Sequence, residues 1–176
     1  MIYDAVESAS ADLVANFATY FAAVVAAKTG LPGSITQTVR VYKRQPAEIF
    51  LAIADPNIAN ALPGLGVYGR PGPYPGERTA LTQAKSVGHR RSTVWLTWDY
   101  VFRGPDAALA VIQGELAIEA VLKHVDVLYG TPGLEAAGDA ELSVAVDLYD
   151  VKQAGEDYYE QRAMVTAPVT TEDTGL

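Results

Sequence analysis

The chain contains no cysteine, and it has only two histidines and two methionines among its 176 residues. The lack of cysteine excludes a disulfide-stabilised scaffold, a thiolate metal site and a cysteine nucleophile. Charged residues make up 19% of the sequence and hydrophobic residues 49%. This composition indicates a folded protein rather than a disordered one, and the length predicts a single domain with a sizeable core.

A basic leader and a long hydrophobic run are also missing. The acidic residues Asp4, Glu7 and Asp12 interrupt the N-terminal apolar stretch, so we do not expect a signal peptide. The longest apolar candidate for a membrane span, Leu13–Ala27, is rich in alanine and about one turn short of a span. We interpret it as part of a buried helix and expect no membrane partner.

Positive charge is scarce overall but unevenly placed. The formal net charge is −8, which argues against a nucleic-acid-binding surface. Between Arg40 and Arg103 there are nine basic and four acidic residues, whereas between Asp139 and Asp173 there are two basic and nine acidic. These segments are either solvated faces or complementary surfaces, in which the basic middle of one copy meets the acidic end of a neighbour.

Apolar periodicity predicts two helices and several strands. Spacings of three and four predict a helix over Ile2–Lys28, and a second helix is predicted from Asp106, its N-cap, to Leu128. Alternation and short apolar runs predict strands at Ile35–Lys43, Ile49–Ala54, Arg78–Ser86, Arg90–Arg103, Asp139–Asp150 and Tyr158–Pro168.

Proline and glycine mark the predicted loop. Residues 56–76 hold five prolines and five glycines, so we expect an extended loop there. The order of elements predicts an α+β fold, in which a mostly antiparallel sheet packs against two helices and ends in a C-terminal β-hairpin. Residues 1–168 are expected to form one domain, and residues 169–176 a flexible acidic tail.

The second predicted helix is apolar on more than one side. Leu109, Ile112 and Leu116 form one row, and further valines, leucines and isoleucines widen it. Such a helix is buried on more than one side. Its second partner is either the N-terminal helix or another subunit, and the sequence favours neither.

No motif predicts catalysis, a cofactor or a metal site. Gly64–Gly69 matches G-x-G-x-x-G, but the prolines around it exclude the helix that a dinucleotide site requires. His124 is interpreted as a helix-surface or boundary residue. Glu119 and Lys123 are expected to form a solvated i, i+4 pair. We therefore expect no enzymatic activity.

The charged clusters supply the candidate subunit-interface residues. These are Arg40, Lys43, Arg44, Arg90, Arg91, Glu141, Asp147 and Glu160. In the Pro/Gly-rich loop, Tyr68, Arg70 and Tyr74 are candidates for contact with a partner.

The order of these segments resembles that of the tail terminator, or tail-to-head joining, proteins of long-tailed bacteriophages. The resemblance rests on an N-terminal helix, early strands with a Pro-rich loop, the run TVWLTWDYVF, the helix PDAALAVIQGELAIEAVLKHV and the closing strand YYEQRAMVTAP. It covers nearly the whole chain and depends on element order, because no residue signature defines the family. The loop is longer than a minimal member needs.

The resemblance implies a structural virion protein without catalytic residues or cofactors. It implies a homo-oligomeric ring, a hexamer, that is assembled in the host cytoplasm and caps the tail tube. Such a ring ends tail polymerisation and joins the tube to the head connector, while DNA passes through the lumen without sequence-specific binding. The alternatives are another neck or head-completion connector protein, or a small ligand-binding or enzymatic α+β domain with the loop as a lid.

Overall fold

The computed structural model describes residues 2–43, 63–71, 90–130, 134–136, 144–153 and 158–173. These residues include the helices α1 (Ile2–Ala26) and α3 (Ala107–Tyr129) and a sheet of seven strands. The strands are β1 (Arg40–Tyr42), β2 (Gly64–Pro71), β3 (Arg90–Gly104), β4 (Leu134–Ala136), β5 (Ala145–Leu148), β6 (Lys152–Gln153) and β7 (Tyr159–Asp173).

The long strands β3 and β7 form the centre of the sheet. They pair antiparallel from Arg90 opposite Asp173 to Gly104 opposite Tyr159. β2 pairs antiparallel with the other side of β3, and β1 pairs parallel with β2. Along its remaining side β7 pairs antiparallel with β6, β5 and β4. The predicted α+β fold with a mostly antiparallel sheet and two helices is confirmed.

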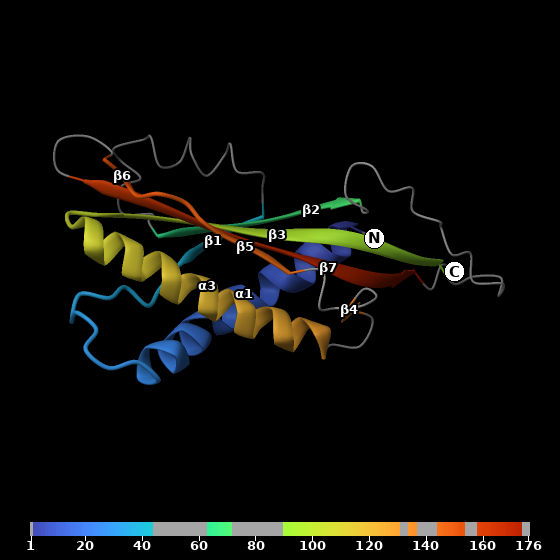
Figure 1. The fold of residues 1–176 in the computed structure, drawn as a ribbon. Helices are drawn as coiled ribbons and strands as arrows, with labels where there is room; N and C mark the ends of the chain where they lie inside the picture. Colours follow the sequence, from blue (N-terminus) through green and yellow to red (C-terminus); the bar gives the residue numbers. More distant parts are fainter. Residues whose placement is uncertain are drawn as a thin grey trace.

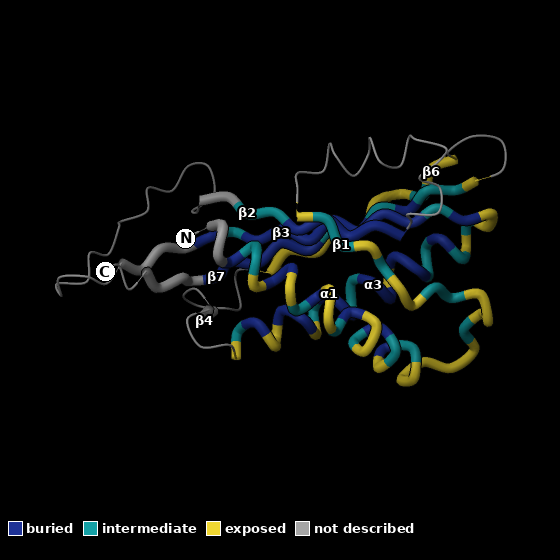
Figure 2. Tube along the Cα trace, turned by 180° about the vertical axis from the view of Figure 1, so that it is seen from behind, coloured by how far each residue is buried: buried dark blue, intermediate teal, exposed yellow. Residues whose placement is uncertain are grey.

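Both helices cover the same face of the sheet (Figure 1). We call this the helix face and the opposite one the outer face. Alternate residues of β3 point to the helix face and are buried, with Trp98 at its centre. In Figure 2 the buried positions lie along the strands and on the sides of α1 and α3. The apolar α1 residues buried there are Ala5, Ala9, Leu13, Phe17, Phe21 and Val24.

The helix α1 is a core helix by its contacts, although it is apolar enough to span a membrane. The segment Ala5–Ala26 meets the length and hydropathy of a span, and the described residues contain 1 such segment. Its spacing of three and four places one face in the core, while Val14 on another face is 70% exposed. Lys28, just beyond the helix, contacts Glu119 of α3 at 2.5 Å.

The helix α3 begins and packs as its sequence indicates. The Asp106 carboxylate accepts a 2.7 Å hydrogen bond from the backbone N–H of Leu109, which confirms the predicted N-cap. One side of α3 packs on β3 and β7, and another side packs on α1. The second partner of this apolar helix is therefore the N-terminal helix of the same chain.

The predicted loop over residues 56–76 is wrong in part, because Gly64–Pro71 forms β2. Leu65 and Val67 are fully buried on the helix face, and β2 lies between β1 and β3. Pairing on both sides and burial of these two side chains outweigh the weak strand preference of its glycines. The other residues of the predicted loop lie outside the described residues, except for Pro63.

The C-terminal region also differs from the prediction. The side chains of Val144, Val146 and Leu148 were expected in the core, but they are 38–44% exposed. The last strand continues through Asp173, paired with β3 and β4. Residues 169–173 therefore belong to the sheet and not to a tail. Alternation identifies which side chains share a face, but coverage of that face depends on the neighbouring elements.

The early strands are shorter than predicted or cannot be compared. Of the run Ile35–Lys43, only Arg40–Tyr42 pairs as a strand. The predicted strands Ile49–Ala54 and Arg78–Ser86 lie outside the described residues.

Candidate assembly interface

The basic middle and the acidic end of the sequence meet within one chain. In the β3–β7 register, Arg90 lies opposite Asp173 and Arg91 lies opposite Glu172. The fold thus gives these two candidate arginines acidic neighbours in the same subunit, so their part in a subunit interface stays a prediction.

Glu160 is also engaged inside the subunit. Its Oε2 lies 2.9 Å from Nε of Arg103, its cross-strand neighbour, and the Glu160 side chain is 18% exposed. This ion pair lies on the outer face near the end of the β3–β7 pair. It links the basic and acidic segments by the same intrachain register.

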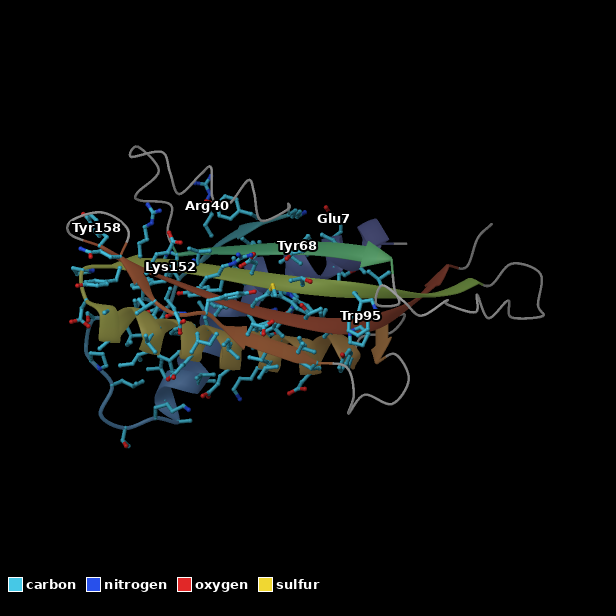
Figure 3. All side chains as sticks on the ribbon, turned by 45° about the horizontal axis from the view of Figure 1, so that its top comes forward. Glu7, Arg40, Tyr68, Trp95, Lys152 and Tyr158 are labelled. Atoms are coloured by element: carbon cyan, nitrogen blue, oxygen red, sulfur yellow. The ribbon has the colours of Figure 1, made fainter. Side chains whose placement is uncertain are left out.

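Arg40 lies on β1, at one side of the sheet (Figure 3), and Lys43 directly follows this strand. Arg40 is exposed, and its guanidinium lies 5.5 Å from the ring centre of Tyr42. The Lys43 Nζ contacts Oε2 of Glu7 on α1 at 2.5 Å. Both cations are at the surface. Arg40 pairs with Gly64, which pairs with Val101. Val101 alternates with the helix-facing residues of β3, so Arg40 lies on the outer face.

Asp147 lies at the opposite side of the sheet, on β5. Asp147 is exposed, and it pairs with Met164. Met164 pairs in turn with Asp99 of β3, a residue of the outer face, so Asp147 lies on the outer face too. Its neighbours Val146 and Leu148 are 44% and 39% exposed. The structure therefore places two of the predicted interface residues, Arg40 and Asp147, on the same face at opposite sides of the sheet.

The remaining candidates are only partly placed. Arg44, Tyr74 and Glu141 lie outside the described residues, and for Arg70 only the backbone in β2 is described. Tyr68 lies on β2, and its hydroxyl contacts the Met164 sulfur at 3.8 Å. Tyr68 is thus a strand residue of the outer face, and its predicted contact with a partner stays a prediction.

Sequence reasoning missed an ion pair on the outer face. Asp99, which is 1% exposed, accepts hydrogen bonds from Nε and Nη2 of Arg162 at 2.8 and 2.6 Å. These hydrogen bonds raise the pKa of Arg162 above its usual range, although burial opposes the shift. The guanidinium also lies 5.2 Å from the ring centre of Tyr149. The pair joins β7 to β3 on the outer face.

The prediction that His124 is a surface or boundary residue is wrong. Its side chain is 0% exposed, and its Nδ1 lies 2.6 Å from Oδ2 of Asp12. The same carboxylate accepts hydrogen bonds from Asn16 at 2.7 Å and from the Tyr20 hydroxyl at 2.9 Å. Trp98 meets the imidazole edge-on, with ring centres 5.6 Å apart. This polar cluster joins α1, α3 and β3.

The cluster sets the charge of its members. Burial lowers the pKa of His124 below its usual value, and the attraction of Asp12 only partly opposes this shift. Burial alone would raise the pKa of Asp12, but the hydrogen bonds from Asn16, His124 and Tyr20 together lower it. Burial and the Asp12 carboxylate raise the pKa of Tyr20 to about 12. At neutral pH the cluster therefore holds a carboxylate and a neutral imidazole.

The His124 imidazole is enclosed by the protein on the side away from Asp12. A general base needs its free nitrogen within hydrogen-bond reach of a substrate, whereas Nε2 of His124 is buried. Among the described residues there is no group of three potential metal ligands.

The sequence carried one signal that His124 is buried. His124 shares the buried stripe of α3 with Val121, Val125 and Leu128.

Glu119 pairs with Lys28, which lies just beyond α1, and not with Lys123 as predicted. Oε1 of Glu119 accepts from Nζ of Lys28 at 2.5 Å. Both side chains are more than 40% exposed, at 42% and 43%, so the pair contributes little to stability.

Comparison of the chain with protein-family models and with curated protein sequences found no match.

Proposed function

We propose that this chain is a structural virion protein of a long-tailed bacteriophage, the terminator subunit that caps the tail tube. In this proposal several copies form a ring, of which six is the number implied by the resemblance. The ring ends tube growth, offers a docking surface to the head connector and lets DNA pass through its lumen. It would be assembled in the host cytoplasm and remain in the neck of the particle.

One feature of the fold carries this proposal: among the described strands, β5 lies at the side of the sheet with exposed apolar side chains. Val146 and Leu148 of β5 are 44% and 39% exposed. An exposed apolar sheet edge is a template for association with another chain, and natural proteins normally protect such edges. An assembly subunit is expected to keep one.

The order of elements supports the terminator role in particular. The resemblance depends on an N-terminal helix, a long alternating strand, a Gly-Pro-Asp turn into a helix and a closing strand. These correspond to α1, β3, α3 and β7, and Asp106 of the turn caps α3. The same order supports a second neck protein less directly, because a head-completion connector needs contacts at the head rather than a tube cap.

The test is electron microscopy of particles from a phage that lacks this chain, with the wild-type chain supplied in trans as the control. Overlong or ragged tubes with unattached heads are the expected result. Tails of normal length that fail to join heads would replace the terminator by another neck component. Intact infectious particles would overturn the assembly function altogether.

A further inference from the structure

Two sides of the sheet end in strands that have one partner each. Within residues 2–43, 63–71, 90–130, 134–136, 144–153 and 158–173, β1 pairs only with β2 and β5 pairs only with β7. Each of these strands presents backbone groups that the described strands do not bind. A second strand with matching side chains would satisfy such groups.

The hydrogen-bond pattern identifies which residues present these groups. The Tyr149 N–H donates to the Arg162 carbonyl at 3.1 Å. Because bonded and non-bonded pairs alternate in an antiparallel ladder, Val146 and Leu148 direct their N–H and C=O groups away from β7. On β1, the Arg40 N–H donates to the Pro63 carbonyl at 2.9 Å. In the parallel β1–β2 pair, alternate residues of β1 bond to β2, so Val41 directs its backbone groups away from β2.

The side chains of these two edges match face by face. On the helix face, β5 presents the exposed Val146 and Leu148, and β1 presents Val41, which pairs with Leu65. On the outer face, β5 presents the exposed Asp147 and β1 presents the exposed Arg40. Joining the edges would place apolar beside apolar and acid beside base.

We propose that β5 of one subunit pairs antiparallel with β1 of the next, so that the sheet continues from subunit to subunit. The occupant of each edge is thus a second copy of this chain. The registers show that β1 and β5 run in opposite directions. A rotation about an axis along the strands keeps these directions, so neighbouring copies meet antiparallel. Such head-to-tail contacts close into a ring when the rotation closes.

This inference deepens the proposed ring and rests on it. It names the ring contact, and it assigns Arg40 and Asp147 to the two sides of that contact. The strands are short, with three and four residues. The contact therefore depends on the apolar and charged side chains as well as on backbone hydrogen bonds.

The first test uses charge reversal on each edge. We expect Arg40→Asp and Asp147→Arg each to weaken self-association by about tenfold per contact, measured by sedimentation velocity of the purified full chain. An equimolar mixture of the two variants restores association, because every contact in an alternating assembly again pairs opposite charges. Lys123→Asp, which changes an exposed α3 residue by the same charge, is the matched control and should associate like the wild type.

The second test blocks the backbone edge without breaking the intrachain ladder. Val146→Pro removes an N–H that points away from β7, so the subunit should fold while association falls by at least about tenfold. Ala107→Pro, at the first helical position of α3 where proline is tolerated, places a proline outside the contact and is the control. Circular dichroism of both variants confirms that the subunit is folded.

Several outcomes would overturn the proposed contact. A wild-type chain that remains monomeric would do so. Association that Arg40→Asp leaves unchanged would also do so, because it would indicate a contact between two β5 strands instead. Binding of purified tail tube protein to the open edges of monomers, without self-association, would assign them to that partner. Failure of the terminator function alone would leave the association measurements intact, so the two failures are distinguishable.

Discussion

Replacing Gly114 by alanine should destabilise this protein, although the same change in an ordinary helix is stabilising. Gly114 is buried in α3 where the helix approaches β7 and β5. A Cβ at this position would lie 2.7 Å from Cγ of Gln161 and 3.1 Å from Cδ1 of Leu148. At 2.7 Å a neighbouring atom must move, because real contacts of this kind are longer.

Gln161 has little freedom to move. It is 0% exposed, and its Nε2 donates hydrogen bonds to the carbonyls of Tyr149 at 2.5 Å and Arg162 at 2.8 Å. Alanine gains about 1 kcal/mol of helix propensity over glycine. Overpacking costs about 1–3 kcal/mol, and each displaced hydrogen bond costs about 1 kcal/mol more. The net loss in the free energy of unfolding is therefore about 1–3 kcal/mol.

Urea unfolding followed by circular dichroism measures this loss. The matched control is Gly130→Ala at the end of α3, where φ is −87° and the nearest atom to a Cβ is a backbone oxygen at 3.5 Å. This control should change stability by less than about 0.5 kcal/mol. A Gly114→Ala variant as stable as the wild type, or more stable, would refute the close approach of α3 to β5 and β7.

Three further predictions concern the Asp12–His124 cluster, the Asp99–Arg162 ion pair and the helix cap. The folded state lowers the pKa of His124 from 6.5 and the pKa of Asp12 from 3.8. Each group therefore contributes its full stabilisation above its unfolded pKa, and that contribution is lost as the pH falls from the unfolded pKa toward the lower folded one. The slope is at most about 1.4 kcal/mol per pH unit for each proton. Unfolding measured from neutral to mildly acidic pH should show the first loss in the wild type and a smaller loss in His124→Gln, whereas equal losses would contradict the assignment. Arg162→Ala leaves the Asp99 carboxylate buried without its guanidinium and should cost about 2–4 kcal/mol of unfolding free energy. Replacing both Asp99 and Arg162 by leucine should cost less, because no unpaired carboxylate is then buried. A larger cost for the double variant would show that the unpaired carboxylate is not the cause of the loss in Arg162→Ala. Asp106→Ala removes the N-cap of α3 and should lower the melting temperature in step with a loss of about 1 kcal/mol, while Asp106→Asn, which keeps a capping oxygen, should come close to the wild type.

The long elements follow from the sequence because their signals are local. In α1 and α3 the apolar spacing matches the helical repeat, and Asp106 supplies the start of α3 within its own first turn. In β3 the alternation of Val94, Leu96 and Trp98 fixes which side chains face the core. These patterns depend on backbone geometry within a few residues, so no knowledge of the partner elements is required.

The sequence could not predict elements whose stability comes from distant partners. The glycine-rich strand β2 exists because β1 and β3 pair with it on both sides. The burial of His124 depends on the approach of Asp12 and Tyr20, which lie more than 100 residues earlier on α1. The short strand β5 shows the opposite case, since the alternation of Val146 and Leu148 predicts a buried face that the described elements leave exposed.

The charge pattern divides in the same way. The sequence alone determined that a basic middle and an acidic end exist, as solvated faces or as complementary surfaces. Only the tertiary structure decided where they meet, because the β3–β7 register brings Arg103 to Glu160 within one chain while Arg40 and Asp147 stay exposed at opposite sides of the sheet. Composition and periodicity are properties of neighbouring residues, whereas register and edge exposure arise from pairing between segments far apart in the chain.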